Sequence, residues 1–355
     1  MYFDLTEDQK VIADTVGALL AKAVPDSEIV QQFDRGSVNR DLWSSLAEMG
    51  LCGILVSEEH GGIGMDLLTL AVVQEQLGQA AAPVPVAANA LAAWLLSASG
   101  DATLRERWVA PLLAGEAIAA FAIEKNGQSD PEAWTQAPAA LSGSLGNILW
   151  AAEADLLIVG CEGGELALIE TTAAGVTVEP VEAVDRSQPL GHVRFDGAVA
   201  TRIEGSTALA TRLCDALFVL SAADACGAGN RAMDLAVEYA TTRKQFDRLI
   251  GSFQGLKHQL ANMKAEMEPV RYLYWYAAHC WDALPAKASY TASLAKAHAS
   301  DVAVRVARAA VEAHGGIGYT WEYPLHIYLK RAMTARAIHG LPSIHRSRSA
   351  ALAGW

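Results

Sequence analysis

Apolar residues near the start of the chain are spaced as in amphipathic helices. They recur at helical intervals at Val11, Ile12, Val16, Leu19 and Leu20. The preceding Thr6-Glu7-Asp8-Gln9 fits a capping box, which predicts that a helix begins here. The stretches DLWSSLAEMG, DLLTLAVVQEQLGQAA and LAAWLLSASG share this period and are separated by turns containing Gly and Pro. We therefore expect residues 1–117 to form a helical domain.

The pattern then changes to short apolar segments bounded by Gly. These segments are ADLLIVG, LALIE, GVTVEP and GHVRFDG, and CEGGE between the first two is typical of a hairpin turn. Residues 118–205 are therefore expected to form a β domain. The helical period returns over 208–242, 254–282, 287–313 and 324–338, long enough to pack as a bundle within residues 206–355. The expected fold is mainly α with a small central β domain.

Composition and charge narrow the class of protein. Of the 355 residues, 52% are apolar and 19% are charged, which is typical of a globular chain. The 27 basic and 40 acidic residues give a net charge of −13, so most of the surface would repel nucleic acid and anionic lipid. We expect neither as a partner. A polyanionic ligand would need a local basic pocket.

The cysteines and the first residues of the chain indicate the cellular compartment to expect. Five cysteines form no CxxC pair and no His/Cys metal spacing, which indicates reduced core residues and no metal site. The chain starts without a basic segment followed by an apolar one, and no run of about 18 or more apolar residues occurs. These patterns predict a cytoplasmic protein.

Two segments of the expected bundle carry candidate ligand-binding chemistry. Arg243 offers planar bidentate donors for a pyrophosphate, and Phe246 and Gln254 follow on the same segment to pack against and hydrogen-bond a nucleotide. Gly315 and Gly316 remove side chains where a backbone must approach a ligand closely. The alternatives are a solvated arginine at a helix end and a turn that merely requires glycine.

Both segments resemble motifs of the acyl-CoA dehydrogenase family. YATTRKQFDRLIGSFQGLKHQLANM is similar to the family's R-x-x-F-G-x-x-(I/L)-x-x-x-Q, and EAHGGIGYTWEYPLHIYLKRA to Q-x-x-G-G-x-G-(Y/F)-x-x-E-Y-P. LWSSLAEMGLCGILVSEEHGGIGM, AIEKNGQSD and the domain order match as well. The resemblance spans the chain and implies FAD held across a subunit interface. It assigns the adenosine side of that site to Arg243, Phe246, Gln254, Glu312, Gly315 and Gly316.

The family reaction implied by the resemblance needs a glutamate base, which this chain lacks. A gapless match from Tyr323-Pro324 to the family's E-G-T-S-Q-I-Q-R puts His339 at the glutamate position. Leu341 and Ser343 then replace the Thr and Gln that touch FAD, and Arg331 replaces the Asp of R-D-A. An imidazole is a competent general base. The residues expected to contact the flavin beside His339 are replaced, however, so no catalytic residue is assigned.

The other positions implied by the resemblance are altered too. Some members carry the glutamate on the first long helix of the bundle, where this chain has Leu217 followed by Phe218. Asp215 is two residues away and is expected on a different helix face. Ile123 replaces the Thr of T-E-P that faces the flavin, and the W-I-T strand is shortened to NILWAAEAD, with no Thr near Trp150.

This chain keeps the residues of the adenosine side and has lost those of the flavin side. In this it resembles the β-type chains of heterotetrameric acyl-CoA dehydrogenases. The resemblance implies an α2β2 enzyme in which this chain completes the FAD site of a related partner acting on an acyl-CoA. The vacated space is then expected to widen for a bulky acyl group. The alternatives are a homotetramer with an atypical base, a structural or CoA-binding chain without FAD, and a flavin-independent hydratase, for which no paired acid and base are seen.

Overall fold

The computed structural model describes residues 4–123, 136–137 and 139–355. Its first part is helical, with α1 (Glu7–Ala23), α2 (Ile29–Arg35), α3 (Arg40–Glu48), α4 (Leu67–Gln79), α5 (Val86–Ala98) and α6 (Ala102–Leu113). The Thr6 side chain accepts a hydrogen bond from the Gln9 amide, and the Gln9 side chain accepts one from the Thr6 amide. The predicted capping box is confirmed, and it satisfies donors that a helix start leaves unpaired.

Two small sheets follow the helices. One has the order β1-β3-β4-β7 and the other β2-β6-β5. Their bounds are β1 (Ala119–Ala122), β2 (Leu141–Leu149), β3 (Leu156–Cys161), β4 (Glu165–Glu170), β5 (Val176–Val181), β6 (Leu190–Ala198) and β7 (Thr201–Arg202). β1 pairs parallel with β3, whereas β3 and β4 form the predicted antiparallel hairpin.

Strand β2 has a local irregularity. It has nine residues and ends at Leu149, directly before Trp150. Its register against β6 shifts between Leu145 and Ile148, where Asn147 has a positive φ of 58°. A β-bulge of this kind bends a strand and redirects its side chains. The irregularity therefore lies directly before the turn that carries Trp150.

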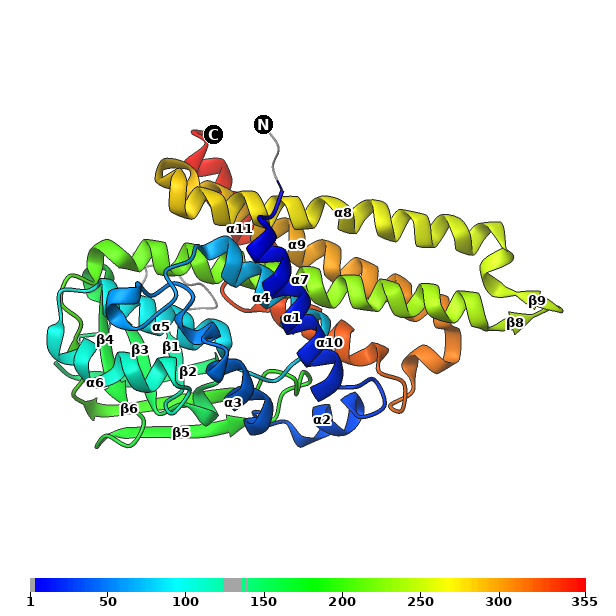
Figure 1. The fold of residues 1–355 in the computed structure, drawn as a ribbon. Helices are drawn as coiled ribbons and strands as arrows, with labels where there is room; N and C mark the ends of the chain where they lie inside the picture. The colour runs from blue at the N-terminus through cyan, green and yellow to red at the C-terminus, as the bar shows by residue number, and fades with distance from the viewer. Residues whose placement is uncertain (1–3, 124–135, 138) are drawn as a thin grey trace.

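The last part is a bundle of long helices, shown on the upper and right side of Figure 1. It comprises α7 (Thr207–Thr242), α8 (Gln254–Ala283), α9 (Pro285–His314), α10 (Leu325–Ala337) and α11 (Pro342–Leu352). The helix α11 was not predicted, because the expected helical segments end at residue 338. Pro342 occupies the first helical turn, where its fixed φ favours a helix start, so the loop ends at Leu341.

A hairpin of β8 (Lys244–Gln245) and β9 (Arg248–Leu249) joins α7 to α8. It projects from the bundle at the end away from the two sheets (Figure 1). Its two turn residues, Phe246 and Asp247, both have positive φ, 53° and 60°. This backbone is that of a type I′ hairpin turn, which normally contains Asn and Gly because bulky residues resist positive φ.

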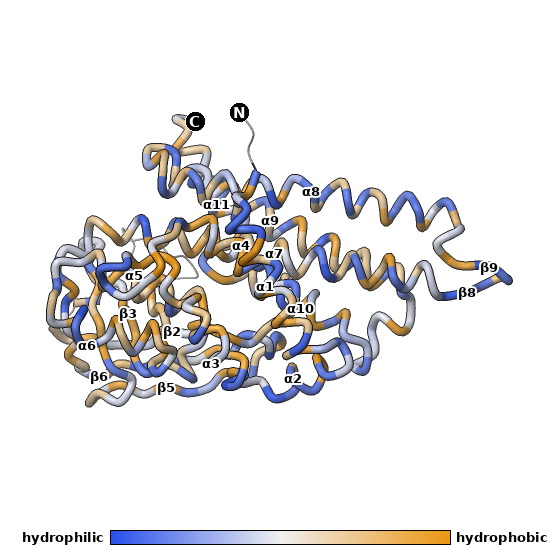
Figure 2. The backbone as a smooth tube through the Cα atoms, in the orientation of Figure 1, coloured by the Kyte–Doolittle hydropathy of each residue, from blue (hydrophilic) through white to orange (hydrophobic). Residues whose placement is uncertain are grey.

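Apolar residues concentrate along α4, α5 and the inner strands, whereas α8 alternates between hydrophilic and hydrophobic segments (Figure 2). All five cysteines are buried and free, as predicted. Burial raises the pKa of Cys52 to about 12, so its thiol stays protonated and inert. Within the part of the chain that the structure describes, no helix has the length and apolar character needed to cross a membrane. The mainly α fold class is confirmed.

Candidate functional site

A cavity of about 70 Å³ lies where the N-terminal helices, β2 and the bundle meet. Both positions considered for the missing base, His339 and Leu217, line this one cavity. The remaining lining comes mainly from apolar side chains, including Phe121, Ile148 and Trp150. The convergence of two positions far apart in sequence supports the gapless match. However, the expected widening is wrong for this cavity, because even a cavity that binds benzene measures about 150 Å³.

The loop that carries His339 is held firmly. His339 and Gly340 both have positive φ, 59° and 112°. The carbonyl of His339 accepts a hydrogen bond from Nε2 of the buried His345, 3.0 Å away. Just before the loop, the carbonyl of Ala335 accepts hydrogen bonds from Lys296 and, at 3.4 Å, from Ser221. These donors satisfy the last turn of α10 and fix the entry to the loop.

Burial lowers the pKa of His345 to about 3, so its ring is neutral in the folded chain at neutral pH. The unfolded histidine has a pKa of about 6.5, and it therefore binds a proton first as the pH falls. Folding stability is expected to decrease from pH 6.5 downward, by up to about 1.4 kcal/mol per pH unit from this residue. Between pH 7 and pH 4, the urea midpoint of His345→Gln should fall less steeply than that of the wild type. Equal slopes for the two proteins would contradict the assignment of this stability loss to His345.

Two polar side chains, Gln74 and Asp224, line one part of the cavity, and Arg331 contacts Asp224. Asp224 on α7 accepts a hydrogen bond from Gln74 on α4 at 2.7 Å and forms a buried ion pair with Arg331 on α10 at 2.6 Å. Arg331 also donates to Ser187 and to the carbonyl of Ala82. Although burial alone would lower the pKa of Arg331, the charge of Asp224 raises it. Arg331 is therefore structural, and the carboxylate of Asp224 is already held by this guanidinium.

Asp215 does not reach the cavity. Its carboxylate accepts hydrogen bonds from Ser289 at 2.6 Å and from Arg348 at 3.1 Å, on the face of α7 that packs against α9 and α11. Burial raises its pKa despite the nearby guanidinium. The different helix face expected for Asp215 agrees with this geometry, and no proton transfer in the cavity can be assigned to it.

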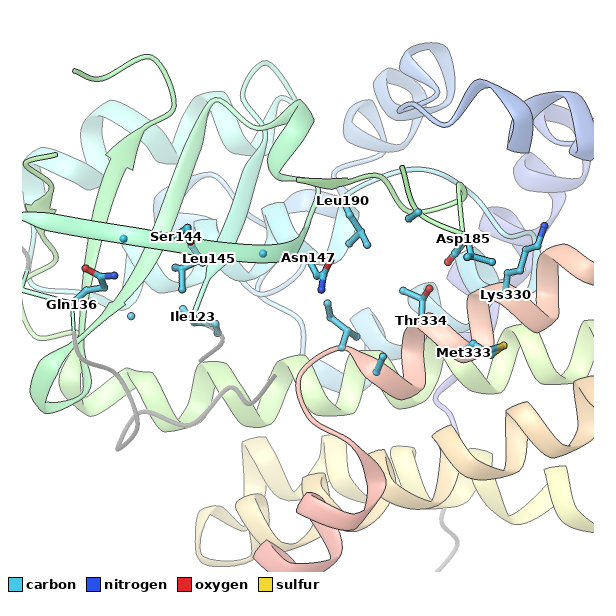
Figure 3. A pocket seen from close by; sticks show the side chains of 18 of the residues that line it. Ile123, Gln136, Ser144, Leu145, Asn147, Asp185, Leu190, Lys330, Met333 and Thr334 are labelled. Atoms are coloured by element: carbon cyan, nitrogen blue, oxygen red, sulfur yellow. The ribbon is translucent and has the colours of Figure 1, made fainter. Parts of the chain in front are cut away.

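A larger groove of about 780 Å³ runs between β2 and α10 (Figure 3). Ile123, Leu145, Leu190 and Met333 provide apolar walls, and Asn147 projects from the bulge of β2. Asp185 and Lys330 lie toward one end (Figure 3). The volume suits a small-molecule ligand. Ile123 is an aliphatic wall residue here, whereas the neighbouring positions Glu124 to Asp130 lie outside the described residues.

The residues expected on the adenosine side lie elsewhere, at the end of the bundle that carries the β8–β9 hairpin. Arg243 ends α7, Phe246 lies at the hairpin tip with its side chain 87% exposed, and Gln254 begins α8. Glu312 lies in the last turn of α9, whose His314 stacks on Tyr239 of α7 at 4.5 Å. None of the expected residues lines the His339 cavity or the groove as described.

Gly315 and Gly316, at this end of the bundle, differ in whether their own backbone conformation requires a glycine. Gly315 has φ 64° and ψ −139°, a backbone that side chains disfavour. Gly316 has no such constraint, and a Cβ built there meets no described atom within 4 Å. Its small size fits the approach of a ligand or a neighbouring chain. Exposed Arg243 and Gly316 therefore fit a dinucleotide, whereas the carboxylate of Glu312 would repel its pyrophosphate.

Several residues of the two cavities were not predicted from the sequence, namely Gln74, Asp185, Asn147, Asp224 and Lys330. One signal was available for Asp224, since it is the single carboxylate between residues 216 and 229 in the apolar part of α7. Such a residue is expected to have a buried partner. The substituted Arg331 was the matching cation.

Comparison with known proteins places the chain among its relatives. Models of the acyl-CoA dehydrogenase N-terminal and C-terminal domains match residues 6–116 and 219–353. Acyl-CoA dehydrogenase IpdE2 of Mycolicibacterium smegmatis is 30% identical over 95% of this chain and 96% of its own. Acyl-CoA dehydrogenase FadE34 of Mycobacterium tuberculosis is 34% identical over 89% of this chain, which spans only 42% of that relative.

A solved structure, the ChsE4-ChsE5 complex from Mycobacterium tuberculosis, superimposes with a TM-score of 0.91. It is 26% identical and covers 100% of this chain and 99% of the matched chain. The fold, both domain models and a relative matched over almost its full length agree. The chain belongs to the acyl-CoA dehydrogenase family.

Proposed function

We propose that this chain is the non-catalytic subunit of an FAD-dependent α2β2 acyl-CoA dehydrogenase. It completes the FAD site of a related chain that carries the glutamate base. The observation that carries the proposal is the position of Arg243 and Phe246, which are exposed at the bundle end and absent from the described lining of the His339 cavity and of the groove. A second support is that a homologous solved structure is a complex of two chains.

The reaction would be α,β-dehydrogenation of an acyl-CoA thioester to the 2-enoyl-CoA. FAD, when bound, accepts the hydride from the β-carbon. The guanidinium of Arg243 would hold the pyrophosphate through paired N–H donors, Phe246 would pack against the dinucleotide, and Gln254 would hydrogen-bond it. The proton from the α-carbon would go to the partner, because the described lining of the His339 cavity has only one carboxylate, Asp224, already paired with Arg331.

One observation favours a second candidate, a homotetramer that uses His339 as the base. The His339 side chain lines the cavity and is 7% exposed, as a catalytic base in a dry site would be. Against it, Ile123 and Leu149 offer no hydroxyl to a flavin ring beside that cavity. A chain that binds CoA without FAD would leave the exposed Arg243 and the open Gly316 unexplained.

The test is to purify the chain alone and co-expressed with a related acyl-CoA dehydrogenase chain that carries the glutamate. Visible spectra and activity are then recorded for both preparations. Alone, the chain is expected to be colourless or substoichiometric in FAD and inactive. The complex should hold one FAD per pair, and His339→Ala should change its activity by only a few-fold. One FAD per chain with turnover in the chain alone, or a loss of about 10²–10⁴-fold in His339→Ala, would support the homotetramer.

A further inference from the structure

The cavity at His339 marks where an acyl group would react, because both base positions of the family pattern face it. Its volume of about 70 Å³ leaves no room for an acyl chain. Its lining includes small residues, Ala87, Ala88 and Ala335, and bulky ones, among them Phe121, Trp150 and Leu217. Among the apolar residues that line it, Trp150 is the one with a positive φ.

Trp150 follows directly on β2, and its side chain lines the cavity while remaining only 6% exposed. Its backbone is left-handed, with φ 66° and ψ −3°. A positive φ is a genuine outlier for a bulky residue and indicates a local constraint, often at a functional site. The Trp150 amide donates to the carbonyl of Pro189 at 2.7 Å, which holds the turn in place.

We infer that Trp150 is a plug that excludes the acyl group from this chain's own cavity. The Trp150 side chain lines the same cavity as His339 and Leu217, and Asp224, paired with Arg331, lines it as well. The inference deepens the proposed function, since it rests on a partner chain binding the acyl group. Trp150 would thus determine specificity by excluding the acyl group from the His339 cavity, through the volume of its side chain alone.

The test compares Trp150→Gly with Asn147→Gly in the full chain. Glycine adopts positive φ without strain, so both variants relax a left-handed residue next to or within β2. Only Trp150→Gly opens the His339 cavity, because Asn147 lines the separate groove. Isothermal titration is performed with indole, octanoyl-CoA and CoA. Trp150→Gly should bind indole and prefer octanoyl-CoA over CoA by tenfold or more, whereas wild type and Asn147→Gly should show neither property.

Several outcomes would overturn the plug. A wild-type chain that prefers octanoyl-CoA over CoA already has an open cavity. A folded Trp150→Gly that gains nothing shows that the indole does not block the space. If Trp150→Gly unfolds, Trp150→Asn tests the same point, because Asn tolerates the left-handed region. Unfolding of both variants without rescue by indole would mean that Trp150 does more than fill volume.

The proposed function can fail separately. FAD content of the complex containing Trp150→Gly depends on the bundle end and is expected to equal that of wild type. Loss of FAD together with an opened cavity would support the role of Trp150 and contradict the proposed FAD site. Normal FAD content without an opened cavity would support the proposed FAD site and contradict the role of Trp150.

Discussion

Arg243→Ala is expected to weaken FAD binding to the complex about ten- to a hundredfold, without unfolding either chain. A charge-assisted hydrogen-bonded contact of this kind contributes about 1.5–3 kcal/mol, which corresponds to that range of affinity. Arg243 is exposed at the end of α7, so its removal leaves no buried group unpaired. Titration of FAD into the apo complex at constant salt measures the change.

Two further variants sharpen this test. Arg243→Lys should recover only part of the affinity, because an ammonium replaces the planar fork with a point charge. Lys244→Ala removes a charge from the adjacent exposed position in β8 and is the matched control for general electrostatic attraction. Equal dissociation constants for wild type and Arg243→Ala would indicate a solvated helix-end arginine. Equal losses in Arg243→Ala and Lys244→Ala would indicate attraction without a specific contact.

Arg331→Met is expected to destabilise the folded chain by about 3–5 kcal/mol, since it leaves the carboxylate of Asp224 buried without its cation. The guanidinium is 1% exposed and bonds to three parts of the chain, through Asp224, Ser187 and Ala82. Chemical unfolding at pH 7, followed by circular dichroism, measures the loss.

The double variant Asp224→Leu/Arg331→Met removes both charges and should recover most of this stability. The exposed pair of Arg305 and Glu266 is the control, and Arg305→Met should cost about 1 kcal/mol or less. A small effect for Arg331→Met, similar to that of the exposed pair, would show that water or a rearranged side chain reaches Asp224. A double variant as unstable as the single one would show that shape at this position matters more than charge.

Much of the fold could be predicted because helical periodicity extends over long segments. The capping box at Thr6 and the ends of α7 and α8 were predicted to within about two residues, the usual uncertainty of such boundaries. By contrast, β1 is too short and too rich in alanine to show a strand pattern. The helix α11 was missed because the match to the family pattern E-G-T-S-Q-I-Q-R outweighed the local signal of Pro342.

The candidate site was predictable where it depends on position along the chain. His339 and Leu217, placed by counting, do meet in one cavity. What counting could not show is the conformation of Trp150, because a left-handed tryptophan contradicts the residue's own preference and is imposed by its surroundings. The pairing of Asp224 with Arg331 likewise depends on contacts between distant elements, although each residue alone was unusual for its place.

The turn at Phe246 and Asp247 has a consequence for the rate and affinity of assembly. Two residues in the left-handed region cost the isolated chain about 1–3 kcal/mol each. In return the phenyl ring is already presented to solvent on a two-residue turn between paired strands, with its centroid 6.1 Å from that of the Phe253 ring in a T-shaped arrangement. A flexible loop would lose conformational entropy at the moment of association, whereas this hairpin loses it during folding. In the proposed complex the hairpin would therefore offer a preorganised contact, and its strain would lower the stability of this chain instead of the strength of the complex.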